Sequence, residues 1–265
     1  MPGDWRSGRV EVAGGYLGYH RTGTAGPPLV LSHGLTDNGL CWRRTAAVLA
    51  KRFDVIMLDA RGHGQSAPIA PGVGTDPALD IAQAIEQLGL DAPIVMGHSV
   101  GARSTARYAS AFPDKVSRVI LEDPPLAAVP DAAKMAQWRE GFRRQVQAFQ
   151  SMNTAQIIAM GRKTSPNWHE DEFPDWAIAK QQVDPNAVLF ETEPWQAYLA
   201  RITAPTLLIY GQPELGGLVT PQLAKEAKAL NRQIRAVQIK AAGHNTRREN
   251  FPDYLAAVQA FLSGA

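Results

Sequence analysis

Short apolar runs alternate with longer segments of helical periodicity along the first half of the chain. Four runs have the length and apolar character of buried strands, at residues 28–33, 55–59, 94–96 and 116–122. The segments between them have helical patterns, over residues 42–53, 78–90 and 99–111. This alternation predicts a mostly parallel sheet with helices on both faces. Upstream, residues 9–23 predict an antiparallel hairpin that turns at Gly14 and Gly15.

The alternation stops at Pro124 and Pro125. From there to about residue 200 the pattern predicts helices and no strand. Sheet and helix patterns then resume, with strands at 205–211 and 235–239 and helices after Pro221 and over 253–262. The middle segment therefore interrupts one sheet. We expect a core built from residues 1–126 and 201–265 and a helical cap over residues 127–200.

Composition and charge exclude several classes of protein. Hydrophobic residues make up 45% of the 265 positions and charged residues 20%, which predicts one globular domain with an insertion. A net charge of +2 gives no electrostatic case for nucleic acid, and we expect short basic pairs such as Arg247-Arg248 to be solvated. A single cysteine, Cys41, excludes an internal disulfide and gives no metal-ligand spacing.

The chain shows no apolar leader pattern and no apolar run long enough to cross a bilayer. We therefore expect a cytoplasmic monomer or homodimer that takes a small-molecule substrate and needs neither a membrane nor a nucleic acid. No nucleotide-binding or metal-binding motif is found, so we expect no cofactor and no metal.

One pentapeptide, Gly97-His98-Ser99-Val100-Gly101, lies where a predicted strand meets a predicted helix. A serine attacks a carbonyl only if its oxygen protrudes and a base can reach it. A sharp strand-to-helix turn exposes the side chain, and the crowding there leaves room for little more than hydrogen at positions 97 and 101. The alternative is a glycine-rich helix start with Ser99 as the N-cap residue.

Three further segments accompany Ser99: His33-Gly34-Leu35 after one predicted strand, DARGHGQS at 59–66 after the next, and AAGHN at 241–245 after the last. In order and spacing the four together resemble the α/β-hydrolase superfamily. The resemblance implies an eight-stranded, mostly parallel sheet with helices on both faces and a helical cap. It implies that Ser99 is the nucleophile and His244 the general base. The backbone N–H groups of Leu35 and Val100 would stabilise the oxyanion.

Two carboxylates compete for the role of orienting His244. The usual family position, after the strand at 205–211, corresponds to Glu214, but the LGGLVTP segment that follows is longer than the family pattern. Some relatives carry the acid one strand earlier, which corresponds to Glu122 at the end of VILE. We favour Glu122, because a carboxylate that ends a buried strand needs a partner. Asp123 would face the opposite side if the strand continued.

A serine at the elbow disfavours the dehalogenases and epoxide hydrolases of this superfamily, which use aspartate there. We expect hydrolysis of a small, apolar or aromatic carboxylic ester or lactone through an acyl-enzyme. An amidase or carbamate hydrolase with the same residues is one alternative, and a binding protein or receptor on a hydrolase scaffold is another. In the cap, Trp138, Trp168 and Trp176 either contact the substrate or join the cap to the core.

Overall fold

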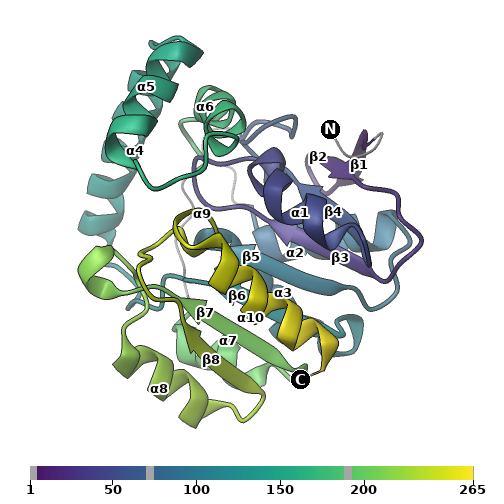
Figure 1. The fold of residues 1–265 in the computed structure, drawn as a ribbon. Helices are drawn as coiled ribbons and strands as arrows, with labels where there is room; N and C mark the ends of the chain where they lie inside the picture. The colour runs from purple at the N-terminus through teal and green to yellow at the C-terminus, as the bar shows by residue number, and fades with distance from the viewer. Residues whose placement is uncertain (1–4, 70–74, 188–192, 265) are drawn as a thin grey trace.

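The computed structural model describes residues 5–69, 75–187 and 193–264. A single eight-stranded sheet has the order β1-β2-β4-β3-β5-β6-β7-β8 (Figure 1). Its strands are β1 (Arg6–Val12), β2 (Gly15–Arg21), β3 (Pro28–Ser32), β4 (Asp54–Leu58), β5 (Ile94–His98), β6 (Arg118–Glu122), β7 (Thr206–Tyr210) and β8 (Ile234–Gln238).

Strand directions match the expectation of a mostly parallel sheet. β1 and β2 pair antiparallel, as do β2 and β4, and every pairing from β4 to β8 is parallel. The predicted hairpin forms, with Gly14 at a positive φ of 76° in its turn. All parallel strands therefore end at one edge of the sheet, where ligand sites of α/β folds lie.

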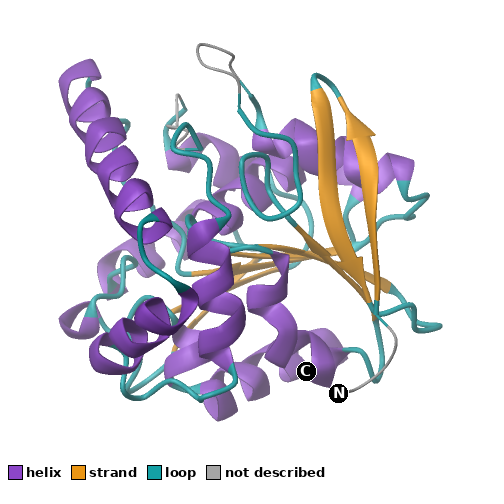
Figure 2. Ribbon diagram, turned by 90° about the horizontal axis from the view of Figure 1, so that it is seen from above, coloured by secondary structure: helices purple, strands orange, loops and turns teal. Residues whose placement is uncertain are grey.

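Helices cover both faces of the sheet (Figures 1 and 2). Alternate residues of β3 belong to opposite clusters, with Val30 on one face and Leu29 and Leu31 on the other. The face with Val30 is covered by α2 (Pro77–Gln87), α3 (Val100–Ala111), α7 (Trp195–Arg201) and α8 (Pro221–Leu230). The other face is covered by α1 (Arg43–Leu49) and α10 (Phe251–Ser263). The short α9 (Thr246–Glu249) precedes α10.

Three helices follow β6 and stand to one side of the sheet: α4 (Ala132–Gln150), α5 (Thr154–Thr164) and α6 (Glu172–Gln181). We call α4, α5 and α6 the cap. The expected cap boundary at residue 200 is wrong, because α7 packs in the core against α3. Trp195 and Tyr198 of α7 are buried in the same cluster as Val30. In the described residues, no helix has the length and hydropathy needed to span a membrane.

Candidate active site

Ser99 occupies a strained turn between β5 and α3. Its φ of 55° and ψ of −124° lie in a region that side-chain-bearing residues rarely adopt. A Cβ atom on Gly97 would collide with the backbone of Gly101, and a Cβ atom on Gly101 would collide with the backbone of His33. The two glycines are therefore required by close approach of the backbone, as the sequence pattern predicted. The Ser99 amide donates to the carbonyl of Glu122, 2.9 Å away, which ties the turn to the end of β6.

His244 is held by Asp123. Its Nδ1 atom lies 2.6 Å from Oδ2 of Asp123, which is fully buried. The same carboxylate accepts hydrogen bonds from the amides of Leu218 at 2.8 Å and Val219 at 3.0 Å. Since Nδ1 is engaged, Nε2 is the nitrogen left to exchange a proton with a reacting group. The His244 side chain is 27% exposed, so the ring is not sealed in the interior.

His98 connects His244 to the serine turn. Its Nε2 atom lies 3.0 Å from the carbonyl oxygen of His244, and the two rings are 4.7 Å apart between centroids. Burial and the charge of Arg247 lower the pKa of His98 well below its usual value, so its ring is neutral. His244 thus contacts His98, the residue before Ser99. It also contacts Asp123, the residue after Glu122, whose carbonyl accepts from the Ser99 amide. These contacts place Ser99 and His244 at the same edge of the sheet.

The predicted pairing of Glu122 with His244 is wrong. The Glu122 carboxylate instead accepts from Oγ1 of Thr246 at 2.8 Å and from the amide of Arg247 at 2.9 Å. It also lies 3.2 Å from the Arg247 guanidinium. Burial raises the pKa of Glu122, and the neighbouring Arg247 opposes that rise. Glu122 therefore holds the loop that follows His244. The alternative residue, Glu214, is exposed on the turn Pro213–Leu215. Within the described part of the chain, the carboxylate that pairs with His244 is that of Asp123, not that of Glu214.

The error came from the assumption that the strand continues. β6 ends at Glu122, and Asp123 has a positive φ of 43°, so strand alternation does not decide where its side chain points. The long LGGLVTP segment was the departure from the family pattern that argued against Glu214, and the structure shows what it contacts. Two amides of this segment, those of Leu218 and Val219, bind the Asp123 carboxylate.

Two backbone N–H groups beside Ser99 are open to a ligand. The carbonyl oxygen of Gly34 accepts from the Asp37 amide at 3.1 Å and from Nδ1 of His33 at 2.8 Å. Because the peptide bond is trans, the N–H of Leu35 points away from that carbonyl. Among the described residues, no hydrogen bond starts from this N–H or from that of Val100, the first residue of α3. Both residues were expected at this position, and both line one pocket.

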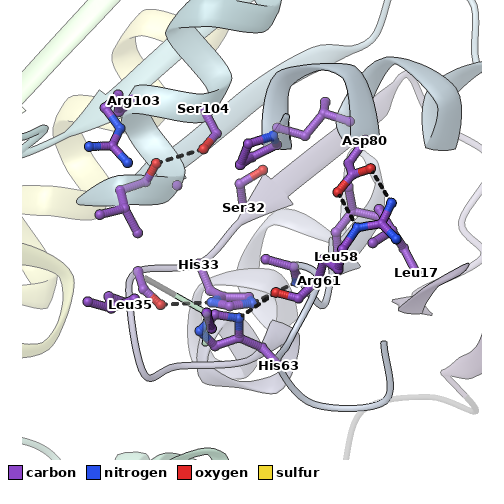
Figure 3. Close-up of a pocket in the computed structure, with 17 residues that line it drawn as sticks. Leu17, Ser32, His33, Leu35, Leu58, Arg61, His63, Asp80, Arg103 and Ser104 are labelled. Carbon is purple, nitrogen blue, oxygen red and sulfur yellow. Dashed lines mark hydrogen bonds and ion pairs between the residues drawn. The ribbon is translucent and has the colours of Figure 1, made fainter. Parts of the chain in front are cut away.

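That pocket has an empty volume of about 730 Å³, part of it open to solvent. Its walls combine apolar side chains with polar ones (Figure 3), among them Leu17, Leu58, Ile81, His33, His63 and Arg103. The ion pair between Arg61 and Asp80, at 2.7 Å, forms a further part of the wall. Ser99 is not itself a lining residue. Val100, the residue after Ser99, does line the pocket, and so does Leu35.

The three cap tryptophans expected to contact substrate do not line this pocket. Trp138 is 55% exposed on α4. Trp168 and Trp176 pack at 5.7 Å between ring centroids in a small cluster with Phe173. Their apolar contacts in this cluster lie within the cap, which differs from both expected roles, substrate contact and a joint between cap and core.

A buried cluster of charges lies below the cap and was missed from the sequence. Arg247 and Arg248 are 1% and 2% exposed at the side chain, so the expectation that they are solvated is wrong. Both donate to Oδ2 of Asp37, at 3.0 and 3.1 Å. Arg248 also contacts Glu172 of α6 at 3.3 Å, and Lys180 of α6 contacts Asp37. The residues of this cluster come from segments far apart in the chain, so local sequence patterns do not predict that they meet.

A family model described as the alpha/beta hydrolase fold matches residues 27–247. The chain belongs to the α/β-hydrolase family. This match covers the strands β3 to β8, the serine turn and the histidine loop, so the expected fold and the expected hydrolase class are confirmed.

Similar proteins of this family include a curated relative from Pseudomonas putida named N-formylmaleamate deformylase. It is 28% identical over 271 residues, covering 96% of each chain. A pimeloyl-[acyl-carrier protein] methyl ester esterase from Photobacterium profundum is 28% identical over 83% of this chain and 88% of that protein. Among solved structures, E-2-(acetamidomethylene)succinate hydrolase superimposes with a TM-score of 0.79 at 23% identity, covering 98% of this chain and 100% of that one.

Proposed function

We propose that the protein is a serine hydrolase that cleaves a small-molecule ester or amide through an acyl-enzyme. In this proposal Ser99 is the nucleophile, His244 the general base and Asp123 the residue that orients His244. The observation that carries the proposal is the 2.6 Å pairing of His244 with buried Asp123, next to a serine on a strained turn. A buried carboxylate on Nδ1 fixes the tautomer in which Nε2 accepts a proton.

Acylation begins with attack of the Ser99 oxygen on the substrate carbonyl. The Ser99 proton passes to Nε2 of His244, and the carbonyl oxygen becomes an oxyanion. The N–H groups of Leu35 and Val100 donate to that oxyanion, and each such donor contributes about 3 kcal/mol of transition-state stabilisation. When the tetrahedral intermediate collapses, His244 returns the proton to the departing alcohol or amine, and the acyl group stays on Ser99.

Deacylation repeats these steps with water in place of serine. His244 takes a proton from water as the water oxygen attacks the acyl carbon, and the same two N–H groups hold the second oxyanion. Collapse of the second intermediate breaks the bond to the Ser99 oxygen, which recovers its proton from His244. The carboxylic acid product then leaves.

Two features favour a small substrate with an apolar part. The pocket has apolar walls at Leu17, Leu58 and Ile81, and the cap stands beside the core. A relative supports an amide as well as an ester substrate: the protein named N-formylmaleamate deformylase matches this chain along 96% of its length. Amide cleavage, the removal of a formyl group from nitrogen, is therefore a second candidate beside ester or lactone hydrolysis.

The test is a fluorophosphonate probe followed by a turnover screen. Peptide mass spectrometry should find the probe on Ser99, and the Ser99→Ala variant should take up none. The screen compares 4-nitrophenyl esters, lactones, N-formyl amides and carbamates, and turnover of any of them should disappear in Ser99→Ala. Folded protein that takes up no probe and turns over no substrate would favour a binding protein on this scaffold instead.

A further inference from the structure

A buried lysine of the cap reaches the loop that carries the Leu35 N–H. Lys180 lies on α6 and is only 5% exposed. Its Nζ atom donates to the carbonyl of Thr36 at 2.9 Å, to Oγ1 of Thr36 at 2.8 Å and to Oδ1 of Asp37 at 3.1 Å. An ammonium group has three protons, so every donor of this side chain is directed at two adjacent residues.

Those two residues complete a tight turn that begins at Gly34. The amide of Asp37 donates to the carbonyl of Gly34 at 3.1 Å. Thr36 has a positive φ of 66°, whereas Leu35 is not among the residues with positive φ. This combination is a type II turn, whose third position favours glycine because a β-branched residue is strained there. The lysine bonds to both the backbone and the side chain of the strained residue.

The turn sets the direction of the Leu35 N–H. Gly34 C=O and Leu35 N–H belong to one planar peptide unit, so whatever fixes the carbonyl also fixes the N–H. One of the two donors to that carbonyl is the amide of Asp37, and Lys180 holds the side chain of Asp37. A chain of contacts therefore runs from the cap to one of the two open N–H groups.

Asp37 is anchored from the core as well. Burial alone would raise the pKa of Asp37, but the charges of Arg248, Lys180 and Arg247 outweigh burial and hold that pKa well below its usual value. Asp37 therefore stays ionised, and two of its three cationic partners, Arg247 and Arg248, come from α9, just after His244. Lys180 is the partner that comes from the cap, and it alone binds Thr36.

We propose that Lys180 is a positioning residue that holds the turn Gly34–Asp37 in the conformation that aims the Leu35 N–H at the oxyanion. This inference rests on the proposed function. It makes the cap part of the catalytic geometry: α6 supplies the lysine, and α6 packs on the short 3-10 helix Gly39–Trp42 of the core. Loss of the lysine should weaken binding of the transition state and leave binding of the ground state nearly unchanged.

The test replaces Lys180 with methionine, which keeps the length and removes all three donors. With 4-nitrophenyl acetate as substrate, Lys180→Met should lower kcat by about 10- to 100-fold with KM within about twofold. Trifluoroacetophenone, which forms a hemiketal oxyanion with a nucleophilic serine, should lose affinity in parallel. Acetophenone, which forms no stable adduct, should bind the variant and the wild-type protein alike.

The matched control lies on the same helix. Asp175 of α6 binds Arg43 of α1 at 2.5 Å, so Asp175→Asn weakens a cap-to-core ion pair and leaves the turn untouched. This variant should stay within about twofold of wild type in kcat and in both affinities. Equal losses in Asp175→Asn and Lys180→Met would overturn the inference, because general loosening of the cap would then explain both. Unchanged kcat and unchanged trifluoroacetophenone affinity in Lys180→Met would overturn it too.

Two results keep the proposals separable. If wild-type protein hydrolyses 4-nitrophenyl acetate no faster than Ser99→Ala does, the proposed function fails, whatever Lys180 does. If wild type is active and Lys180→Met behaves as wild type, only the inference about Lys180 fails. Should Lys180→Met not fold, as judged by circular dichroism, Lys180→Gln is read against the same criteria. Its neutral amide removes the ammonium charge and leaves at most two N–H donors on a shorter side chain.

Discussion

The Nδ1 atom of His244 lies 2.6 Å from Oδ2 of Asp123, a residue that has already left the strand ending at Glu122. The two adjacent carboxylates therefore point to different partners: Asp123 to His244, and Glu122 to Thr246 and Arg247. Asp123 therefore orients the general base His244, and Glu122 supports the segment that follows His244. The two roles predict that Asp123→Asn lowers kcat and that Glu122→Gln lowers stability.

Asp123→Asn should lower kcat by about 10³- to 10⁴-fold on any accepted substrate, because an amide neither stabilises the imidazolium nor enforces the correct tautomer. Steady-state kinetics with the best substrate of the screen measures this. Glu214→Gln is the matched control, since its side chain is exposed, and it should stay within about twofold of wild type.

Glu122→Gln should instead act on stability. It weakens buried hydrogen bonds to Thr246 and Arg247, so the free energy of unfolding should fall by about 1–3 kcal/mol in urea titrations. The folded fraction should keep most of its kcat. A large kcat loss in Glu122→Gln together with normal turnover in Asp123→Asn would reverse the two roles.

Strain at Ser99 predicts that the nucleophile is held at a cost to stability. Its φ of 55° and ψ of −124° suit glycine better than any side-chain-bearing residue. Ser99→Gly should raise the free energy of unfolding by about 1 kcal/mol, whereas Ser99→Ala should leave it unchanged within about 0.5 kcal/mol. Both variants should be inactive. Lower stability in Ser99→Gly than in Ser99→Ala would argue that the turn is relaxed.

Close backbone approach at the serine turn predicts that Gly97 tolerates no side chain. Gly97→Ala should lower the free energy of unfolding by more than about 2 kcal/mol, because its Cβ atom would meet the backbone of Gly101. Gly141 of α4 is the matched control, since a Cβ atom there has nothing within 4 Å. Gly141→Ala should stabilise the helix by about 0.5–1 kcal/mol. Similar melting curves for the two variants would contradict the crowding.

Periodicity predicted the sheet and its helices because those patterns are local. The alternation of apolar runs and helices up to residue 122 needed no knowledge of the partner strands, and Gly97 and Gly101 marked the serine turn directly. The helical segment after Pro125 was also visible, but its end was misplaced. The apolar residues of α7, such as Trp195, have the same spacing whether a helix packs on the cap or on the sheet.

What the sequence did not predict depends on residues far apart in the chain. The choice of Asp123 over Glu122 turns on one backbone angle after the strand and on amides about 95 positions downstream. Burial of Lys180 and Arg247 depends on Asp37, which is 143 positions before the lysine and 210 before the arginine. A charged residue gives no local sign that a remote partner will neutralise it.

Buried histidines beside the pocket predict acid sensitivity. His63 is 5% exposed, and burial together with nearby His33 lowers its pKa from 6.5 to about 3. The unfolded chain binds a proton at this position near pH 6.5, whereas the native protein binds it only near pH 3. Between these values the unfolded state carries more protons. The free energy of unfolding therefore falls as the pH falls through this range, by about 1.4 kcal/mol per pH unit for this histidine.

His63→Gln removes the group that binds this proton. Urea titrations at about pH 7, 6 and 5 should therefore show a free energy of unfolding that changes less with pH, by about 1.4 kcal/mol per pH unit below pH 6. The variant loses the contact of Nδ1 with the carbonyl of Arg61, so its stability at neutral pH should also be lower. His169, 52% exposed on the cap, is the matched control, and His169→Gln should keep the wild-type slope. An unaltered slope in His63→Gln would mean that His63 takes up its proton in the native protein, and that its site admits water.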